Sequence, residues 1–214
     1  MDDEPVGTRD GDAPPGRRVR VDARRNESAV LEAAKAVFAT SGVDAPVREI
    51  AARAGVGIAT LYRRFPKRSD LVAAVFRREV DACTAEAASL AAEHPPAEAL
   101  ARWLRRYAAF IAAKKGLAAA LHSGDPAFDA LPDYFRTRFE PALASLLDAA
   151  VAAGEVRADV AAFDLLRAIG NLSVASGEDA VAHTRRMVDL LIDGLGADAT
   201  GAAASPVRGR RPRR

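Results

Sequence analysis

The sequence predicts an all-α protein, and three observations support this prediction. Alanine is abundant, and it is the best intrinsic helix former among the amino acids. Runs such as VLEAAKAVFA, EAASLAAEH and ALASLLDAAVAAG lack the alternation and the β-branched enrichment that are typical of strands. Half of the 214 residues are hydrophobic, which is enough to build a sizeable core. We therefore expect about nine helices in the folded part of the chain.

Three short helices are predicted first, from apolar spacing and from residues that begin or end helices. A first helix is expected over residues 26–41, with Asn26 as its N-cap. A second is expected to begin at Pro46, because proline is favoured at a first helical position, and to end at Gly55. A third is expected over residues 58–65.

The second and third helices have the spacing of a helix-turn-helix, whose second helix enters the major groove of DNA. Gly55 allows the positive φ that the tight turn needs, and Val56 fills the inner side of the turn. Leu61 and Phe65 lie four residues apart and are expected to face the core. The opposite face then carries small and cationic side chains, which suit contacts with DNA.

Longer helices are expected in the rest of the chain, between two tails rich in glycine, proline, arginine or small residues. The chain divides into a disordered arm (1–22), a helix-turn-helix domain (23–78, motif at about 46–65), a C-terminal helical domain (79–196) and a disordered basic tail (197–214). The longer helices cover about residues 69–93, 96–113, 115–122, 127–153 (with breaks near Pro132 and Pro141), 160–176 and 178–195.

Charge is distributed unevenly along the chain, although the net charge is only +2. Residues 17–78 hold 14 basic and 6 acidic side chains, a net charge of +8. Residues 79–196 hold 11 basic and 17 acidic side chains, a net charge of −6. Residues 1–16 carry −4 and residues 197–214 carry +4. A basic block beside an acidic one indicates a polyanionic partner for the basic part alone.

Several classes of function lack sequence support. The three histidines, His94, His122 and His183, are far apart and lack the spacing of metal ligands. The sequence has neither a G-x-S-x-G nor a G-x-x-x-x-G-K motif, so we expect no enzyme activity, no cofactor and no metal. The single cysteine, Cys83, suits a reducing cytoplasm. Because no apolar run is long enough to span a membrane and no signal peptide is evident, a cytoplasmic location is expected.

Residues 24–76 contain the ordered match IAARAGVGIATLYRRFPKRSDL, and this segment resembles the N-terminal domain of the TetR family of transcriptional regulators. The resemblance implies three small DNA-binding helices, followed by a C-terminal helical domain that binds an inducer and forms dimers. The similarity beyond residue 80 is weaker in sequence, although the number and lengths of the helices fit.

The resemblance also implies which residues contact DNA. Ile58, Ala59 and Thr60 open the helix that reads base edges in the family, but the spacing of Ile58 also fits packing in the core. Arg48 either contacts DNA or is a solvated surface arginine. Arg64 stands where the family usually has a phosphate-binding histidine. The residues expected to contact DNA are Arg25, Arg48, Ile58, Ala59, Thr60, Tyr62, Arg63, Arg64, Lys67 and Arg68.

Some segments depart from the family pattern or leave alternatives open. Residues 45–46 are Ala-Pro where threonine is common, so the side-chain N-cap of the second helix is expected to be missing. Arg18 or Arg20 either enters a minor groove as part of an arm or belongs to a disordered, solubilising tail. The C-terminal RGRRPRR either attracts phosphate non-specifically or is a charged tail without function.

The C-terminal domain supplies a candidate ligand pocket and, by resemblance, a dimer interface. Pockets between bundle helices are mainly apolar with a few polar groups, and ordinary core packing is the alternative for each aromatic side chain. In the family the last two helices form the dimer interface as a four-helix bundle, which here means residues 160–176 and 178–195. The candidate pocket residues are Trp103, Tyr107, Phe110, His122, Tyr134, Phe135 and Asn171.

The function that fits these observations is a homodimeric repressor of a palindromic DNA operator, released by an unidentified small apolar inducer. Its half-sites should lie about 34–36 Å apart, one turn of DNA, or more if two dimers bind. Alternatives are an architectural DNA-binding protein without an inducer, or a transcriptional activator of the same fold. A scaffold with a vestigial DNA module is disfavoured because Tyr62, Arg63 and Arg68 are present.

Overall fold

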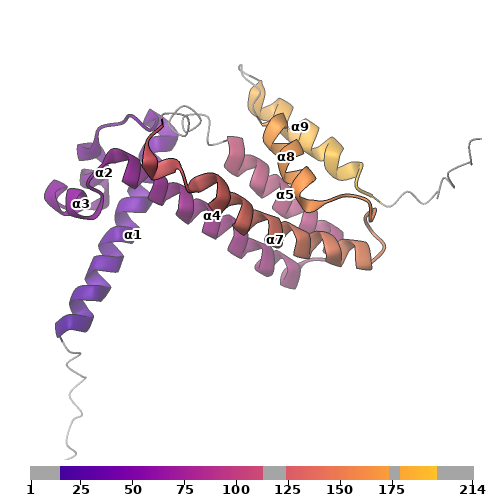
Figure 1. Ribbon diagram of the computed structural model, residues 1–214, viewed down its shortest axis with the longest axis horizontal. Coiled ribbons are helices and arrows are strands. Elements are labelled where there is room, and N and C mark those ends of the chain that lie inside the picture. The colour runs from indigo at the N-terminus through magenta and orange to yellow at the C-terminus, as the bar shows by residue number, and fades with distance from the viewer. Residues whose placement is uncertain (1–14, 113–123, 174–178, 197–214) are drawn as a thin grey trace, which may run out of the picture. The chain divides into compact units, whose positions relative to one another are not determined.

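The computed structural model describes residues 15–112, 124–173 and 179–196, with side chains from residue 22 onwards, and confirms the all-α fold (Figure 1). Within these residues the only pairing of extended backbone is a single bridge between Val156 and Gly196. The helices are α1 (Pro15–Ser41), α2 (Val47–Ala54), α3 (Ile58–Arg64), α4 (Arg68–Glu93), α5 (Pro96–Ala112), η2 (Pro126–Phe128, a 3₁₀ helix), α7 (Leu131–Ala152), α8 (Ala162–Leu172) and α9 (Ala180–Asp193).

The described residues form two compact units. The first unit comprises residues 15–80 and 124–135, and the second comprises residues 81–112 and 136–196 with its gap. The helices α4 and α7 each run from one unit into the other as a continuous helix. The sequence placed residues 124–135 with the C-terminal domain, whereas in the structure they pack with the N-terminal helices.

The first helix is longer than the sequence predicted. It begins at Pro15, so residues 15–25 extend it beyond the expected start at Asn26. Asn26 lies inside the helix with an exposed side chain, and its prediction as an N-cap was wrong. Proline is tolerated in the first turn, where its missing N–H has no partner to lose, and the arginines and alanine that follow propagate a helix well. Residues 1–14 lie outside the described residues.

The core of the first unit is built from the apolar stripes of α1, α2 and α3 and from the first turns of α4. Val37 and Ile50 are almost fully buried, and Leu61 and Phe65 turn from α3 into the same core, as predicted. Val56 packs against this cluster and fills the inner side of the turn. Figure 1 shows these three helices at the N-terminal end of the chain, in indigo and purple.

The turn between α2 and α3 depends on a glycine. Gly55 has φ 66°, in the left-handed region, and its amide donates to the carbonyl oxygen of Ala52 at 3.2 Å. The amide of Val56 donates to the carbonyl oxygen of Ala51 at 3.1 Å. These bonds satisfy carbonyl groups that the end of a helix leaves without a partner. The turn therefore fixes the angle at which α3 leaves α2.

Gly55→Ala is expected to lower the free energy of unfolding by about 1–2 kcal/mol, because L-residues with a side chain rarely adopt the left-handed conformation. No atom lies within 4 Å of an added Cβ at this position, so the loss is due to the backbone alone. Gly57→Ala is the matched control, since Gly57 has φ −65° and its added Cβ meets Thr60 Oγ1 only at 3.9 Å. Urea denaturation of both variants tests this, and an equal loss in both contradicts it.

Residues 124–135 pack against α4, in a cluster that Phe38 and Val43 of the N-terminal segment also contact. Phe128 and Leu131 are buried against Val72 and Ala73 of α4. Asp125 caps the 3₁₀ helix by accepting a hydrogen bond from the amide of Ala127 at 2.9 Å, and this bond holds the pKa of its carboxyl group below its usual value. A segment distant in sequence thus completes the N-terminal unit.

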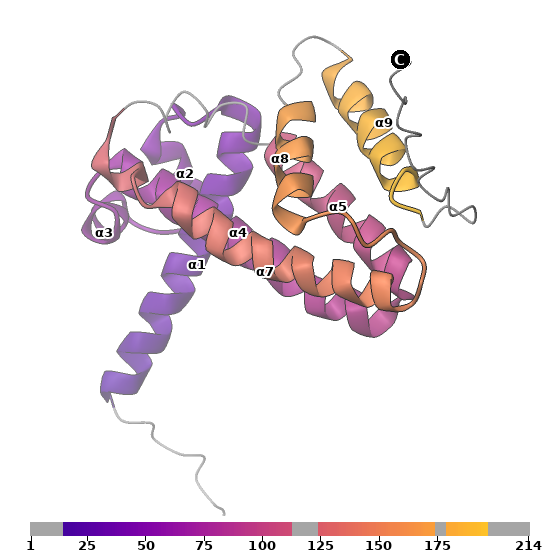
Figure 2. The ribbon, with the colours of Figure 1, turned by 45° about the vertical axis from the view of Figure 1, so that its right-hand side comes forward.

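The second unit is a bundle of α5, the second parts of α4 and α7, α8 and α9. Trp103, Leu104, Leu143 and Ile169 are fully buried at its centre. The helices α8 and α9 pack against each other and against α5 (Figure 2). The predicted helix at 115–122 lies outside the described residues.

The predicted helix breaks at Pro132 and Pro141 were wrong, because α7 runs unbroken from Leu131 to Ala152. Pro132 lies in the first turn, where the missing amide breaks no helical hydrogen bond. Pro141 lies inside the helix and is exposed, and it costs about 3 kcal/mol of helix propensity. Burial of Phe139, Leu143 and other apolar residues on the inner face of α7 offsets this cost.

Across the helices that the structure describes, none is both long enough and apolar enough to cross a lipid bilayer.

Candidate nucleic-acid interface

The third helix presents one side to the core and another to solvent. Leu61 is buried, whereas Ile58 and Tyr62 are each 47% exposed. Ala59 and Arg63 are exposed as well. The helix therefore has a buried side that packs in the core and an exposed side, as the sequence predicted. Ile58 is not a core residue, because about half of its surface is exposed to solvent, and its contact with DNA stays a prediction.

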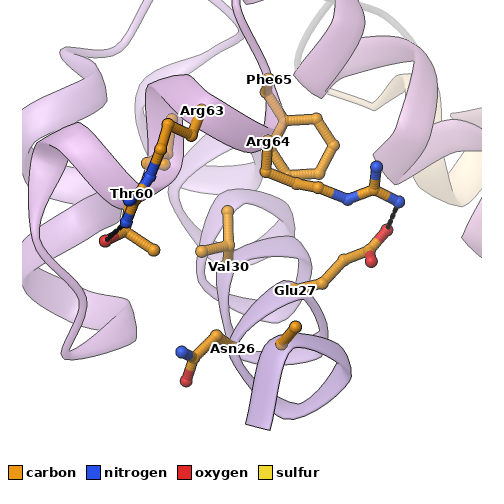
Figure 3. A pocket seen from close by; sticks show the side chains of 9 residues that line it. Asn26, Glu27, Val30, Thr60, Arg63, Arg64 and Phe65 are labelled. Carbon is orange, nitrogen blue, oxygen red and sulfur yellow. Dashed lines mark hydrogen bonds and ion pairs between the residues drawn. The ribbon is translucent and has the colours of Figure 1, made fainter. Parts of the chain in front are cut away.

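Arg63 is held by a neighbour on its own helix. Its Nη2 donates to Thr60 Oγ1 at 3.1 Å, an interaction between residues three apart (Figure 3). This bond leaves the other guanidinium donors of Arg63 available for a phosphate or a base edge. Thr60 and Arg63, one turn apart on α3, thus form one polar unit of this helix.

Arg64 makes a contact that the sequence did not reveal. Its Nη2 donates to Glu27 Oε1 of α1 at 2.7 Å (Figure 3). The hydrogen bond to Glu27, together with the negative charge of that carboxylate, raises the pKa of Arg64 further above its already high value. The two residues are 37 positions apart, so only the fold brings them together.

A hollow of about 340 Å³, lined by residues of α1 and α3, lies beside this ion pair. Val30, Leu61 and Phe65 form its apolar floor, and Figure 3 shows Arg63 on one side of it and Arg64 on the other. Around this hollow α1 and α3 share the core cluster that holds Val30, Leu61 and Phe65, and the ion pair of Arg64 with Glu27 joins them.

Arg68 has a structural role in addition to its predicted contact with DNA. Its Nη1 donates to the carbonyl oxygens of Val43 and Ala45 at 2.6 and 2.7 Å, which fastens the loop between α1 and α2 to the start of α4. Lys67 is exposed, and its backbone amide donates to the carboxylate of Asp70 at 3.0 Å. The partly buried Arg68 side chain is thus already bonded, while the side chain of Lys67 lies at the surface.

The remaining predicted DNA contacts, Arg25 on α1 and Arg48 on α2, are exposed on the first unit. Pro46 is the N-cap of α2 rather than its first helical residue, and no side-chain hydrogen bond caps this helix, as the sequence predicted. Proline offers no side-chain acceptor at this position, so the first amides of α2 have no side-chain partner there.

Two family models match the chain. One, described as bacterial regulatory proteins of the tetR family, matches residues 30–75, and the other, described as the SbtR-like transcriptional regulator C-terminal domain, matches residues 95–197. The crystal structure of a TetR transcriptional regulator from Streptomyces coelicolor is 39% identical, covers 81% of this chain and 99% of that chain, and has a TM-score of 0.69. The chain belongs to the TetR family of transcriptional regulators.

Further solved structures agree with the TetR assignment. A TetR transcription regulatory protein from Mycobacterium vanbaalenii is 36% identical, with 83% of this chain and 99% of that chain covered and a TM-score of 0.63. A gamma-butyrolactone receptor described as ArpA-like is 25% identical over 82% of this chain and 90% of that chain, with a TM-score of 0.51. A search of curated proteins gave no match.

As a TetR-family member the protein is a DNA-binding transcriptional regulator and not an enzyme. The resemblance seen in residues 24–76 is therefore confirmed, and the match over residues 95–197 extends it to the C-terminal domain. The described residues contain no group of three or more His, Cys, Asp or Glu side chains that could hold a metal ion.

Three of the predicted ligand-pocket residues of this TetR-family protein form an aromatic cluster in the second unit. Trp103 stacks on Tyr107 with ring centroids 5.7 Å apart, and Phe139 meets Tyr107 and Phe110 at 5.0 and 5.3 Å. The indole N–H of Trp103 donates to the carbonyl oxygen of Cys83 at 2.9 Å. All four rings are buried, so the cluster is part of the core of the second unit, and the role of its residues in binding a ligand stays a prediction.

Tyr107 is the polar member of this cluster. Burial raises the pKa of its hydroxyl to about 12, with a smaller contribution from Cys83, so the phenol stays protonated at neutral pH. It lies 3.5 Å from the carbonyl oxygen of Leu166 on α8, to which it donates. The hydroxyl has one proton, so while it donates to Leu166 its oxygen can still accept a hydrogen bond from a donor group on a ligand.

The other candidate pocket residues lie elsewhere or outside the described chain. Tyr134 and Phe135 belong to the first unit, where Phe135 packs against the cluster around Phe128. Asn171 is exposed on α8. His122 lies outside the described residues. A separate hollow of about 140 Å³ lies between α5 and α9, lined by small residues of α5 such as Ala108 and Ala109, which sequence analysis missed.

Proposed function

We propose that this TetR-family regulator is a homodimeric repressor that binds a palindromic operator and is released from it by a small apolar ligand. The observation that carries this proposal is the exposed face of α3, where Tyr62 and Arg63 stand away from the core of the first unit. Two such helices, one from each protomer, fit two half-sites about 34–36 Å apart. Since its target is chromosomal DNA, we place the protein in the cytoplasm.

Apolar side chains on α8 and α9 support the proposal that the protein forms a homodimer through these helices. Phe163, Val181 and Leu190 are exposed, with Leu190 at 62%, in a unit whose other large apolar residues are mostly buried. Exposed large apolar groups on neighbouring helices suit a protein–protein contact. Leu165, Leu166 and Ile169 of α8 are buried within the protomer. The proposed interface therefore uses only the exposed part of α8.

The aromatic cluster of the second unit supports the proposal that a small molecule binds this protein. It combines apolar rings with the protonated hydroxyl of Tyr107, the composition expected of a pocket for a small, mainly apolar molecule. The similar ArpA-like protein is, by its description, a gamma-butyrolactone receptor. The helix α4 is continuous from Arg68 to Glu93, and a shift of this helix on ligand binding is the proposed route to the change in DNA binding. Coupling of this kind changes operator affinity about 5–150-fold.

Leu190→Glu is expected to raise the dimer dissociation constant at least about 100-fold, because it places an unpaired carboxylate in an apolar contact. Sedimentation equilibrium measures this constant, and operator affinity should fall with it. Ala92→Glu is the matched control, since it adds the same charge at an exposed position of α4. A Leu190→Glu protein that stays dimeric contradicts the assignment of α9 to the interface.

Release of the operator by a ligand is tested by adding a panel of small apolar compounds, gamma-butyrolactones among them, to the protein–operator complex. Fluorescence anisotropy of labelled operator DNA reports release. The proposal predicts that a compound which binds the second unit lowers operator affinity about 5–150-fold. A compound that binds with unchanged operator affinity contradicts ligand-controlled release, and one that raises affinity points to a corepressor or activator.

A further inference from the structure

The recognition helix α3 has few attachments to the rest of the first unit. It contains seven residues, and its N-cap, Gly57, makes no side-chain capping bond. A hollow lined by residues of α1 and α3, Val30 among them, lies beside it. Helices this short are not stable by themselves and depend on tertiary contacts. The orientation of α3 therefore rests on Leu61, Phe65 and any polar contact that its other side chains make.

The polar contact is the ion pair between Arg64 and Glu27. Of the side-chain hydrogen bonds in the described part of the chain, it is the one that joins α3 to another helix. Arg64 follows Leu61 by three residues and so lies on the flank of α3 that faces α1. Figure 3 shows its side chain reaching along Phe65 toward Glu27, with the guanidinium carbon 5.8 Å from the ring centroid.

The ion pair leaves Arg64 able to bind DNA. The side chain of Arg64 is 61% exposed, whereas that of Glu27 is 31% exposed. Only Nη2 is used by the carboxylate, so Nε and Nη1 remain available as donors. An arginine already fixed at one nitrogen loses less side-chain freedom when a phosphate binds at another. Glu27 thus has the position needed to hold Arg64 ready for the DNA backbone.

We propose that Glu27 is a positioning residue for DNA binding: it orients Arg64 toward a backbone phosphate and steadies the end of the recognition helix against α1, without touching DNA itself. Simple electrostatics predicts the opposite effect for this residue, because a carboxylate near DNA repels phosphate and its removal should strengthen binding. The direction of the change in affinity therefore separates the two accounts.

The test uses the full-length protein and a duplex of about 30 base pairs, which is roughly three helical turns, that the wild-type protein selects from a random-sequence pool. Dissociation constants are measured by fluorescence anisotropy between about 50 and 200 mM salt. We expect Glu27→Gln to weaken binding about threefold to tenfold. Its dependence on salt should stay that of the wild type, since the protein still neutralises the same phosphates.

Arg64→Gln is expected to weaken binding and also to reduce the salt slope by about 0.9 for each phosphate that the protein no longer neutralises. In the Arg64→Gln background, Glu27→Gln should then cause no further loss of affinity, because Glu27 acts through Arg64. Glu32→Gln is the matched control: it removes the same charge from α1 and breaks an ion pair with Arg78 at 2.9 Å, away from α3. Circular dichroism checks that each variant is folded.

Equal or tighter binding by Glu27→Gln at every salt concentration overturns the proposal, as does an equal loss of affinity in Glu32→Gln. A loss that persists in full when Arg64 is already replaced also overturns it, since Glu27 would then act independently. Each of these outcomes leaves DNA binding by the wild-type protein intact, so the proposal can fail without the family function failing.

Discussion

Replacing Tyr62 and Arg63 together by alanine is expected to lower operator affinity at least about 30-fold, because the change removes two side chains whose interactions with DNA are worth about 1–3 kcal/mol each. Both side chains are exposed on α3, and neither belongs to the core cluster of the first unit. The fold should therefore be retained, with a circular dichroism spectrum and a thermal midpoint close to those of the wild type. Anisotropy against operator DNA at constant salt measures the loss of affinity.

Arg102→Ala is the control for this double variant. Arg102 lies on α5 in the second unit, where it bonds to Glu98 of the same helix at 2.7 Å. Removing it subtracts one positive charge from the protein without changing α3, so operator affinity should stay within about twofold of the wild type. Equal losses of affinity in the two proteins show that general charge, rather than the face of α3, determines binding.

Trp103→Ala is expected to lower the free energy of unfolding of the second unit by about 3–5 kcal/mol. The side chain is fully buried, stacks on Tyr107 and meets the edge of Phe139 at 6.0 Å. Its removal leaves a large cavity and also deletes the hydrogen bond from the indole to the carbonyl oxygen of Cys83. Denaturant unfolding followed by far-ultraviolet circular dichroism measures the change.

Two further variants define the origin of this effect. Trp103→Phe keeps an aromatic ring in the cluster but removes the indole hydrogen bond, so its loss of stability should be smaller, about 1–3 kcal/mol. Arg102→Ala, at the neighbouring exposed position, should change stability by less than about 0.5 kcal/mol. If Trp103→Ala unfolds at the wild-type denaturant concentration, the cluster is a loosely packed cavity wall rather than part of the core.

The helix-turn-helix was predictable because its determinants are local. Gly55 marks a turn that needs positive φ, and Leu61 and Phe65 mark the inner side of a short helix by their spacing alone. The boundaries of α2, α3 and α4 accordingly agree with the sequence prediction to within one or two residues. Ile58 remained ambiguous because a residue in the first turn of a helix can satisfy the apolar spacing and still lie outside the core.

Contacts between distant residues were not predictable from the sequence. Glu27 pairs with Arg64 across 37 positions. Arg68 bonds to backbone carbonyl groups of Val43 and Ala45, and because every residue has such a group, the sequence does not show which ones it binds. The packing of Phe128 against Val72 and Ala73 of α4 likewise joins residues that are far apart in the sequence. Pro141 failed as a helix-breaking residue because burial along α7 outweighs its local cost. Tertiary packing decided each of these features.

The central claim, sequence-specific operator binding, is tested most directly by selecting DNA from a random-sequence pool with the purified wild-type protein. The selected duplexes are then compared with scrambled duplexes by anisotropy at about 150 mM salt. We expect the selected sequences to share an inverted repeat and to bind at least about 10³-fold more tightly than the scrambled ones. Selected and scrambled duplexes that bind equally, and that lose affinity equally as salt rises, would show counterion release alone and contradict the account.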